Sequence, residues 1–302
     1  MNRIKQIKLL LIAMVAAAHL CSCSSLSKSQ LESVAKFADG CDSFTAYPSL
    51  LFHEINNIRR ESAFWYSASL NSPERRVEEI VALSAHHSAG MKMAKGADLS
   101  MEILSKYSRA LKSLAHKNRV ESPGVDVRRA GRAIDSLIIA FNSLQIVSPL
   151  STGLASSVAK IVAYGAELNA SRVRAEALRV LIPEGDSIVN QLCRSLETIL
   201  KEEETKSLIL HEQKMVISNY LSFVRITGSN IEEDRKFAEV KERADRLTRV
   251  RTSTINSVGA LRRAHNKLAA NIENGIPLPE LFEEIGEFRN EVEKLYKIVK
   301  KL

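Results

Sequence analysis

Apolar residues recur at steps of three and four positions along almost the whole chain, and this period is typical of amphipathic helices. The pattern is most sustained near the C-terminus, where residues 184–225 and 230–274 each predict one long helix. In the second of these, apolar residues alternate three- and four-residue steps from Phe237 to Ile272, as in a coiled-coil seam. A short Thr-Gly-Ser-Asn connection joins the two patterns, so we expect an antiparallel hairpin.

Residues that break helices are scarce, and alternating strand patterns are missing. The 302 residues include only 12 Gly and 7 Pro, and 45% of them are hydrophobic, which is typical of a folded globular protein. We therefore predict an all-α fold, a helical bundle with a long antiparallel coiled-coil-like helical hairpin toward the C-terminus. An N-terminal bundle of shorter helices is expected over 31–183, and the hairpin with a C-terminal helix over 184–302.

Turn-forming residues predict where the shorter helices end. Asp39-Gly40 should end a first helix over 31–38, and Ile182-Pro183 should end the helix that precedes the hairpin. The other helices are expected over 48–70, from Pro73 onward, over 98–115 and over 127–147. Residues 150–164 are rich in Ala, Ser and Gly and predict a buried helix.

The N-terminus has the charge and hydropathy order of a secretory signal. Three basic residues precede an apolar run from Leu9 to Ala18. The next residues, Leu20-Cys21-Ser22-Cys23, resemble the signal of a bacterial lipoprotein, with Leu three positions and Ser one position before Cys23. The resemblance implies that residues 1–22 are removed and that Cys23 is acylated, with palmitate as an expected label.

Three other outcomes stay open at this terminus. A secretory signal cut after Ala18 would leave a periplasmic protein without lipid. The apolar run could remain as a membrane helix, although it is about half of the ~20 residues that a span needs. Cys21 could be acylated instead, but Leu20 beside it fits the lipoprotein pattern less well.

A lipid anchor would place the protein at a membrane surface. Several acyl chains together hold a protein almost permanently, because each buried methylene contributes about 0.8 kcal/mol. Ser24 follows Cys23 where an inner-membrane lipoprotein of the enteric type has Asp, and this implies the outer membrane, facing the periplasm. Residues 23–30 would form a polar tether.

Two cysteines remain after signal removal and acylation, Cys41 and Cys193. In an oxidising compartment they could form a disulfide that ties the N-terminal segment to the long helices. The alternative is two separate thiols, each buried in a helical core.

Catalytic and cofactor motifs are missing. The mature sequence contains no phosphate-binding glycine loop, no Gly-x-Ser-x-Gly and no His-Glu-x-x-His. We therefore expect no cofactor and no enzymatic activity. One cluster combines ligand types that suit copper(I), namely His86, His87, Met91 and Met93. The commoner alternative is that such methionines pack in a helical core.

Charged residues of both signs are interleaved, and the net charge of +8 for the whole chain does not require a nucleic-acid ligand. Arg251 and His265 interrupt the otherwise apolar seam. We expect a snorkelling arginine and a hydrogen-bonded histidine, both of which set the register of the helices. The charged run over 201–206 is expected to be a solvated face.

The predicted function is that of a non-catalytic, lipid-anchored protein of the cell envelope. It would present a helical surface to another envelope protein, as a scaffold, an adaptor or an immunity-type lipoprotein. The alternative is a periplasmic carrier that binds a small ligand or a metal ion within its bundle. An exposed apolar stripe on the long helices would favour the first function, and a polar or Met/His-lined pocket the second.

Overall fold

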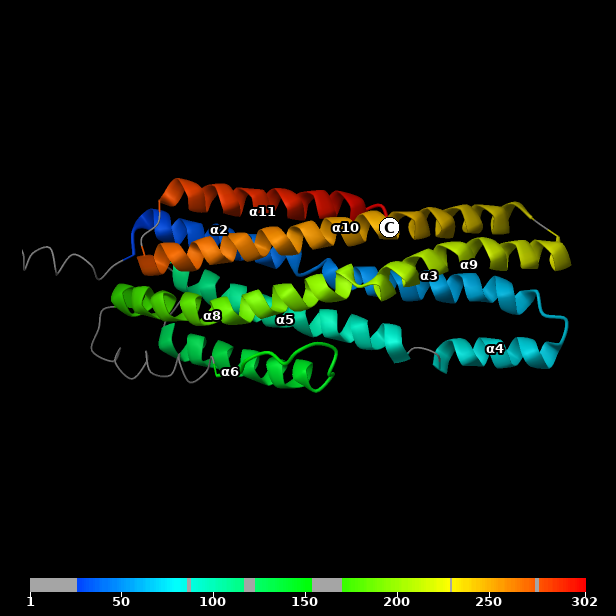
Figure 1. Cartoon of the computed structure of the whole chain (residues 1–302), viewed down its shortest axis with the longest axis horizontal. Helices are drawn as coiled ribbons and strands as arrows, with labels where there is room; N and C mark the ends of the chain where they lie inside the picture. The colour runs from blue at the N-terminus through cyan, green and yellow to red at the C-terminus, as the bar shows by residue number, and fades with distance from the viewer. Residues whose placement is uncertain (1–25, 86–87, 117–122, 154–169, 229, 275–276) are drawn as a thin grey trace, which may run out of the picture.

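The computed structural model describes residues 26–85, 88–116, 123–153, 170–228, 230–274 and 277–302. The regular elements in these ranges are all α-helices, which pack lengthwise into an elongated bundle (Figure 1), so the predicted all-α fold is confirmed. The helices are α2 (Lys28–Phe44), α3 (Pro48–Ala68), α4 (Pro73–Ala85), α5 (Ser88–Ala115), α6 (Pro123–Asn142), α8 (Ala170–Lys201), α9 (Glu203–Thr227), α10 (Ile231–Asn274) and α11 (Leu278–Val299).

Helix α10 is the longest element, and most of the bundle is assembled on it. Its 44 residues extend roughly 65 Å at 1.5 Å per residue. Helices α2, α3, α8, α9 and α11 all pack against it. Its buried face follows the seam expected from the sequence, through Val240, Ala244, Leu247, Thr254, Val258, Leu261, His265 and Leu268. The three- and four-residue spacing therefore identifies the face that packs.

Different helices begin and finish at the two ends of the bundle, which we call proximal and distal (Figure 1). At the proximal end, α2 and α11 begin, and Leu26, the first described residue, lies beside the start of α2. At the distal end, α3 and α9 finish and α4 and α10 begin. Among the described residues, no helix is both long enough and apolar enough to cross a membrane.

The expected end of the first helix at Asp39-Gly40 is wrong, because α2 continues to Phe44. It also begins earlier than expected, at Lys28, where the Ser27 hydroxyl accepts a bond from the Gln30 amide N–H. Gly40 serves packing rather than a turn. A Cβ atom at this position would lie 2.8 Å from Cε1 of Phe288, so only glycine allows α11 to approach so closely.

The expected stop at Ile182-Pro183 is also wrong, because Pro183 lies inside α8. Proline removes one helical hydrogen bond. However, Leu181 and Ile182 before it and Ile188 and Val189 after it are all buried. Core packing on both sides therefore keeps the helix continuous.

The single long helix expected over 184–225 is instead two helices, α8 and α9, which meet at Glu202. Glu202 takes extended backbone angles, with φ −54° and ψ 142°. Two carbonyl groups exposed by the break accept side-chain bonds: Thr205 Oγ1 donates to Ile199 O (2.6 Å), and Arg251 Nε donates to Leu200 O (2.6 Å). Arg251 on the seam thus satisfies a carbonyl group at the end of α8.

Other helix boundaries also differ from those expected from the sequence. Helix α6 ends at Asn142, five residues earlier than expected, because the Asn142 side chain bonds both the N–H and the carbonyl of Leu150. Helix α5 begins at Ser88 rather than at residue 98. The buried helix expected over 150–164 lies mostly outside the described residues.

Candidate functional site

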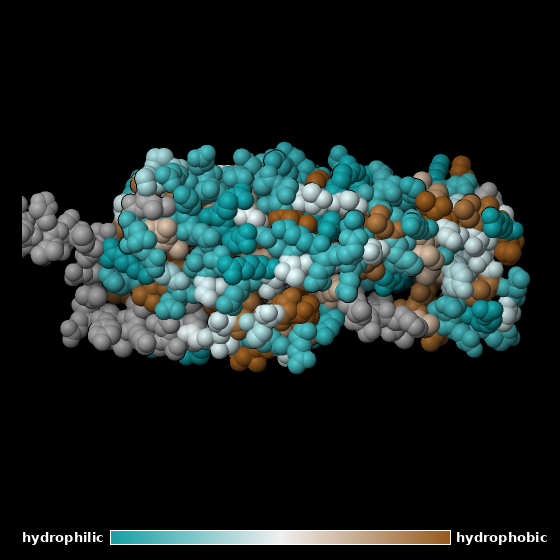
Figure 2. Space-filling model, viewed as in Figure 1, coloured by the Kyte–Doolittle hydropathy of each residue, from teal (hydrophilic) through white to brown (hydrophobic). Residues whose placement is uncertain are grey.

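Exposed hydrophobic side chains gather at the distal end of the bundle. In Figure 2 hydrophobic residues are visible at this end, where α9 finishes and α10 begins, and a second hydrophobic patch lies over α6. We call the set at the distal end the distal apolar surface. It consists of Phe64, Tyr66, Val77, Ile80, Val81, Ile217, Leu221, Ile226 and Ile231. These residues come from α3, α4, α9 and α10, which are the helices that meet at this end.

Helix α4 contributes the most exposed part of this surface. Val77, Ile80 and Val81 share one face of the helix, since they lie three and four positions apart. Val77 is 60% and Val81 64% exposed, and none of the described side chains of α4 is buried. The helix packs mainly against α3. The fold thus leaves the apolar face of an amphipathic helix facing solvent.

Helix α9 carries apolar residues on two sides. Ile209, Val216 and Tyr220 are buried against the bundle. The neighbouring stripe, Leu210, Ile217 and Leu221, is exposed. Its spacing of seven and four residues keeps these side chains on one line along the helix. Large apolar patches that a fold leaves uncovered are typical of interaction sites.

A cluster of aromatic side chains packs between the helices that carry the distal apolar surface. The Tyr220 and Phe237 rings are stacked with centroids 4.2 Å apart, and Trp65 contacts Tyr220 edge-on at 5.2 Å. Trp65 Nε1 donates to Glu233 Oε2 (2.8 Å), and the Tyr220 hydroxyl donates to Asp234. Burial and the Asp234 carboxylate raise the pKa of Tyr220 to about 12. The cluster fixes α3, α9 and α10 relative to one another.

Two arginines reinforce the same three helices. Arg243 of α10 binds Glu54 Oε1 (2.6 Å) and Glu61 Oε1 (2.9 Å) of α3. Burial lowers the pKa of Arg243, but the bonds from both carboxylates outweigh it, so the net direction is upward. Arg59 of α3 pairs with the buried Glu212 of α9 at 2.6 Å. These pairs hold the helices that carry the distal apolar surface.

His265 on the α10 seam is fully buried and joins three helices, as expected of a hydrogen-bonded histidine. Its Nδ1 lies 2.9 Å from Asp186 Oδ1 of α8, and its Nε2 lies 2.7 Å from the Tyr107 hydroxyl of α5. The carboxylate only accepts, so Nδ1 carries a proton, and in the neutral imidazole Nε2 then accepts the Tyr107 O–H. Burial raises the pKa of Tyr107 well above its usual value. Tyr107 and His265 are both buried.

In the structure Cys41 and Cys193 are buried free thiols, so the disulfide considered from the sequence is not formed in it. Burial raises the pKa of Cys41 well above its usual value, and Cys193 adds to the shift. Burial also raises the pKa of Cys193. Both thiols are therefore uncharged at neutral pH.

The other predicted site residues are placed only in part. Cys23, His86 and His87 lie outside the described residues, and so does the side chain of Met91. Met93 is half-buried and packs against the core. Within the described ranges, no group of three or more His, Cys, Asp or Glu side chains is arranged to hold a metal ion. The copper-site hypothesis, which the sequence offered beside the commoner alternative of core methionines, thus stays untested.

No protein family, curated protein or solved structure matches this chain. The function must therefore be inferred from the geometry of the protein itself.

The sequence shows that Val77, Ile80 and Val81 are apolar but does not show that they are exposed, because the same spacing is found on a helix face that packs.

Proposed function

We propose that this protein is a non-catalytic, lipid-anchored component of the cell envelope that docks another envelope protein through its distal apolar surface. The lipid on Cys23 would hold the proximal end of the bundle at the outer membrane. The distal end would then project into the periplasm. The observation that carries the proposal is the position of the uncovered apolar residues, at the end of a long bundle opposite the start of α2.

The occupant that fits this surface best is a protein with a complementary apolar helix face. A helix that lies in a bilayer surface usually has a strongly basic polar face. In α4, by contrast, Arg75 and Arg76 are followed by Glu78 and Glu79. An apolar stripe bordered by charges of both signs is typical of a protein interface with a polar rim.

The orientation of the bundle supports the same occupant. A tail on Cys23 would be attached only three positions before Leu26, the first described residue, which lies beside the start of α2. The distal end would therefore point away from the membrane that holds the tail. A surface in that position meets proteins of the periplasm rather than its own bilayer.

The anchor is tested by metabolic labelling with palmitate. We expect the label on the wild-type protein and none on Cys23→Ser, whereas Cys21→Ser should retain it. Label that persists on Cys23→Ser, or no label on the wild type, would refute the anchor. Fractionation of the same cells should place the labelled protein with the outer membrane.

Docking is tested by affinity capture with matched surface variants. Val77→Ser/Val81→Ser removes two exposed side chains of α4, and Ile139→Ser removes one from α6 that is 63% exposed but lies away from the distal end. We expect the first variant to lose at least tenfold of its captured partner and the second to lose none. Ile217→Ser/Leu221→Ser on α9 should reproduce the loss. Equal capture by all variants would exclude this surface, and capture of only a second copy would make it a self-association site.

A further inference from the structure

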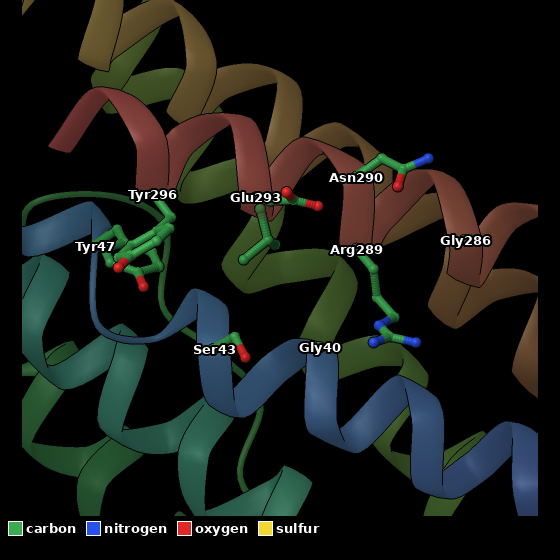
Figure 3. Close-up of a pocket in the computed structure, with 9 residues that line it drawn as sticks. Gly40, Ser43, Tyr47, Gly286, Arg289, Asn290, Glu293 and Tyr296 are labelled. Carbon is green, nitrogen blue, oxygen red and sulfur yellow. The ribbon is translucent and has the colours of Figure 1, made fainter. Parts of the chain in front are cut away.

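A groove lies on the proximal half of the molecule between α2 and α11 (Figure 3). The two helices run in the same direction and touch at Gly40, where the stem of Arg289 packs beside the glycine. Further along, Tyr47, which follows the end of α2, meets Tyr296 of α11, and their ring centroids are 6.1 Å apart. The groove, whose lining on α11 runs from Gly286 to Tyr296, has a volume of about 510 Å³.

Gly286 lines the groove and has no packing reason to be glycine. No described atom lies within 4 Å of the position that a Cβ would take there. Glycine inside a helix costs about 1 kcal/mol relative to alanine. At Gly40 close approach of Phe288 explains that cost, but at Gly286 no part of the described protein does. A glycine of this kind is expected where a ligand approaches the backbone closely.

The polar side chains of the groove differ in whether they already have a partner: the Ser43 hydroxyl donates to the Asp39 carbonyl. Within the described structure, Arg289 has no ion pair or hydrogen bond, and the hydroxyls of Tyr47 and Tyr296 have no protein partner. Glu293, the carboxylate that lines the groove, is already paired with Lys297 at 2.8 Å. Among the described charged residues that line the groove, Arg289 is therefore the one without a partner, and a second cation, Lys300, lies 5.9 Å from the centroid of the Tyr296 ring.

We propose that this groove binds an organic carboxylate that carries a flat ring. The carboxylate would pair with the Arg289 guanidinium and pass over the backbone at Gly286, since planar guanidinium groups favour bidentate carboxylate contacts. The ring would pack on Tyr47 and Tyr296. Arg289 and Tyr296 are seven residues apart on one helix, so carboxylate and ring would be separated by about 10 Å.

Two sources share this chemistry, a free aromatic acid and the C-terminus of a peptide with an aromatic residue near its end. The probes for them are ω-phenylhexanoate and the peptide acetyl-Phe-Gly-Gly with a free carboxylate. Their controls are ω-phenylhexanol and the same peptide as its amide, which lack the charge. Hexanoate, which lacks the ring, tests the tyrosine end.

Binding is measured on the purified full-length protein by an NMR titration of the Gly40 and Gly286 amide resonances. We expect the changes in these chemical shifts to saturate with at least one of the two acids. That acid should bind at least tenfold more tightly than its neutral control and than hexanoate. Saturation by only one acid identifies the source. If neither acid saturates the shifts, the proposal is wrong.

Variants locate the bound acid. Arg289→Gln should abolish the preference for the acid over its neutral control, whereas Arg235→Gln, an exposed arginine at the distal end, should preserve it. Gly286→Leu should lower the affinity for the acid at least tenfold. The midpoint of thermal unfolding of this variant should stay at or above the wild-type value. Wild-type affinity in Gly286→Leu would place the ligand elsewhere and overturn the proposal. This result is independent of docking at the distal end.

Discussion

A few buried polar side chains determine how the helices of this bundle are aligned. His265 can satisfy both ring nitrogens only if α5 presents Tyr107 and α8 presents Asp186 at the same level of α10. A shift of any of the three helices by one turn would leave a buried nitrogen without a partner. Such a shift costs free energy that apolar packing alone would not impose.

Tyr107→Phe removes only the hydroxyl that donates to His265 Nε2. We expect the free energy of unfolding to fall by about 1–3 kcal/mol, because a buried acceptor loses its partner. Chemical denaturation followed by circular dichroism measures the change. Tyr66→Phe, at an exposed tyrosine, should change stability by less than about 0.5 kcal/mol. Equal effects of the two variants would show that the Tyr107 bond contributes nothing.

The buried thiol of Cys41 should make stability depend on alkaline pH. Burial raises its pKa above the ordinary value of 9.0, so the folded state keeps a proton that the unfolded state has lost. The thiol's contribution is therefore fully present below the unfolded pKa and is lost as the pH rises above it. For one such group the loss is about 1.4 kcal/mol per pH unit.

Cys41→Ala measures this dependence on the reduced protein. Above the ordinary thiol pKa, the free energy of unfolding of the wild type should fall more steeply than that of the variant, by about 1.4 kcal/mol per pH unit. Denaturant titrations at a series of alkaline pH values give the two slopes. Parallel slopes would mean that the thiol ionises equally in both states.

At the scale of helices, two glycines that look alike in the sequence have opposite roles. A Cβ at Gly40 would meet Phe288, whereas a Cβ at Gly286 would meet no described atom. We expect Gly40→Ala to destabilise the fold by about 1–3 kcal/mol through overpacking. Gly286→Ala should stabilise it by about 0.5–1 kcal/mol, because alanine is the better helix former. Thermal denaturation of both variants checks these opposite signs, and a shift in the same direction would contradict the contact at Gly40.

The same residues show what a single sequence can predict of this fold. The three- and four-residue spacing identifies the buried face of α10, because a helix that packs along its length needs that period. Helix ends were predicted less well. Gly40 and Pro183 are usual signals of an end, but here packing on both sides keeps α2 and α8 continuous. At the break near Glu202, the distant Arg251 donates to the Leu200 carbonyl, a contact that no local pattern reveals.

The candidate surfaces were harder to predict than the core. The sequence predicts a helix from Pro73 onward, but periodicity does not show whether the apolar face of Val77, Ile80 and Val81 meets a partner within the same chain. Gly286 and Arg289 gave no recognisable motif. A glycine within a well-formed heptad helix was the signal that could have led to the groove between α2 and α11.

For the molecule as a whole, the long axis separates the two surfaces that we assign to binding. The groove between α2 and α11 lies toward the proximal end, and the distal apolar surface lies where α3, α4, α9 and α10 meet (Figure 1). Helix α4 flanks the distal end with none of its described side chains buried. Removing its exposed valines should therefore affect binding far more than folding.

Photo-crosslinking in intact cells tests the central claim most directly. A photoreactive phenylalanine analogue is placed at Val77, at Leu221 or, as a control, at Ile139 of the full-length protein. We predict an adduct with one and the same envelope protein from Val77 and from Leu221, and none with that protein from Ile139. Equal adducts from all three positions, or adducts with lipid alone, would contradict docking through the distal end.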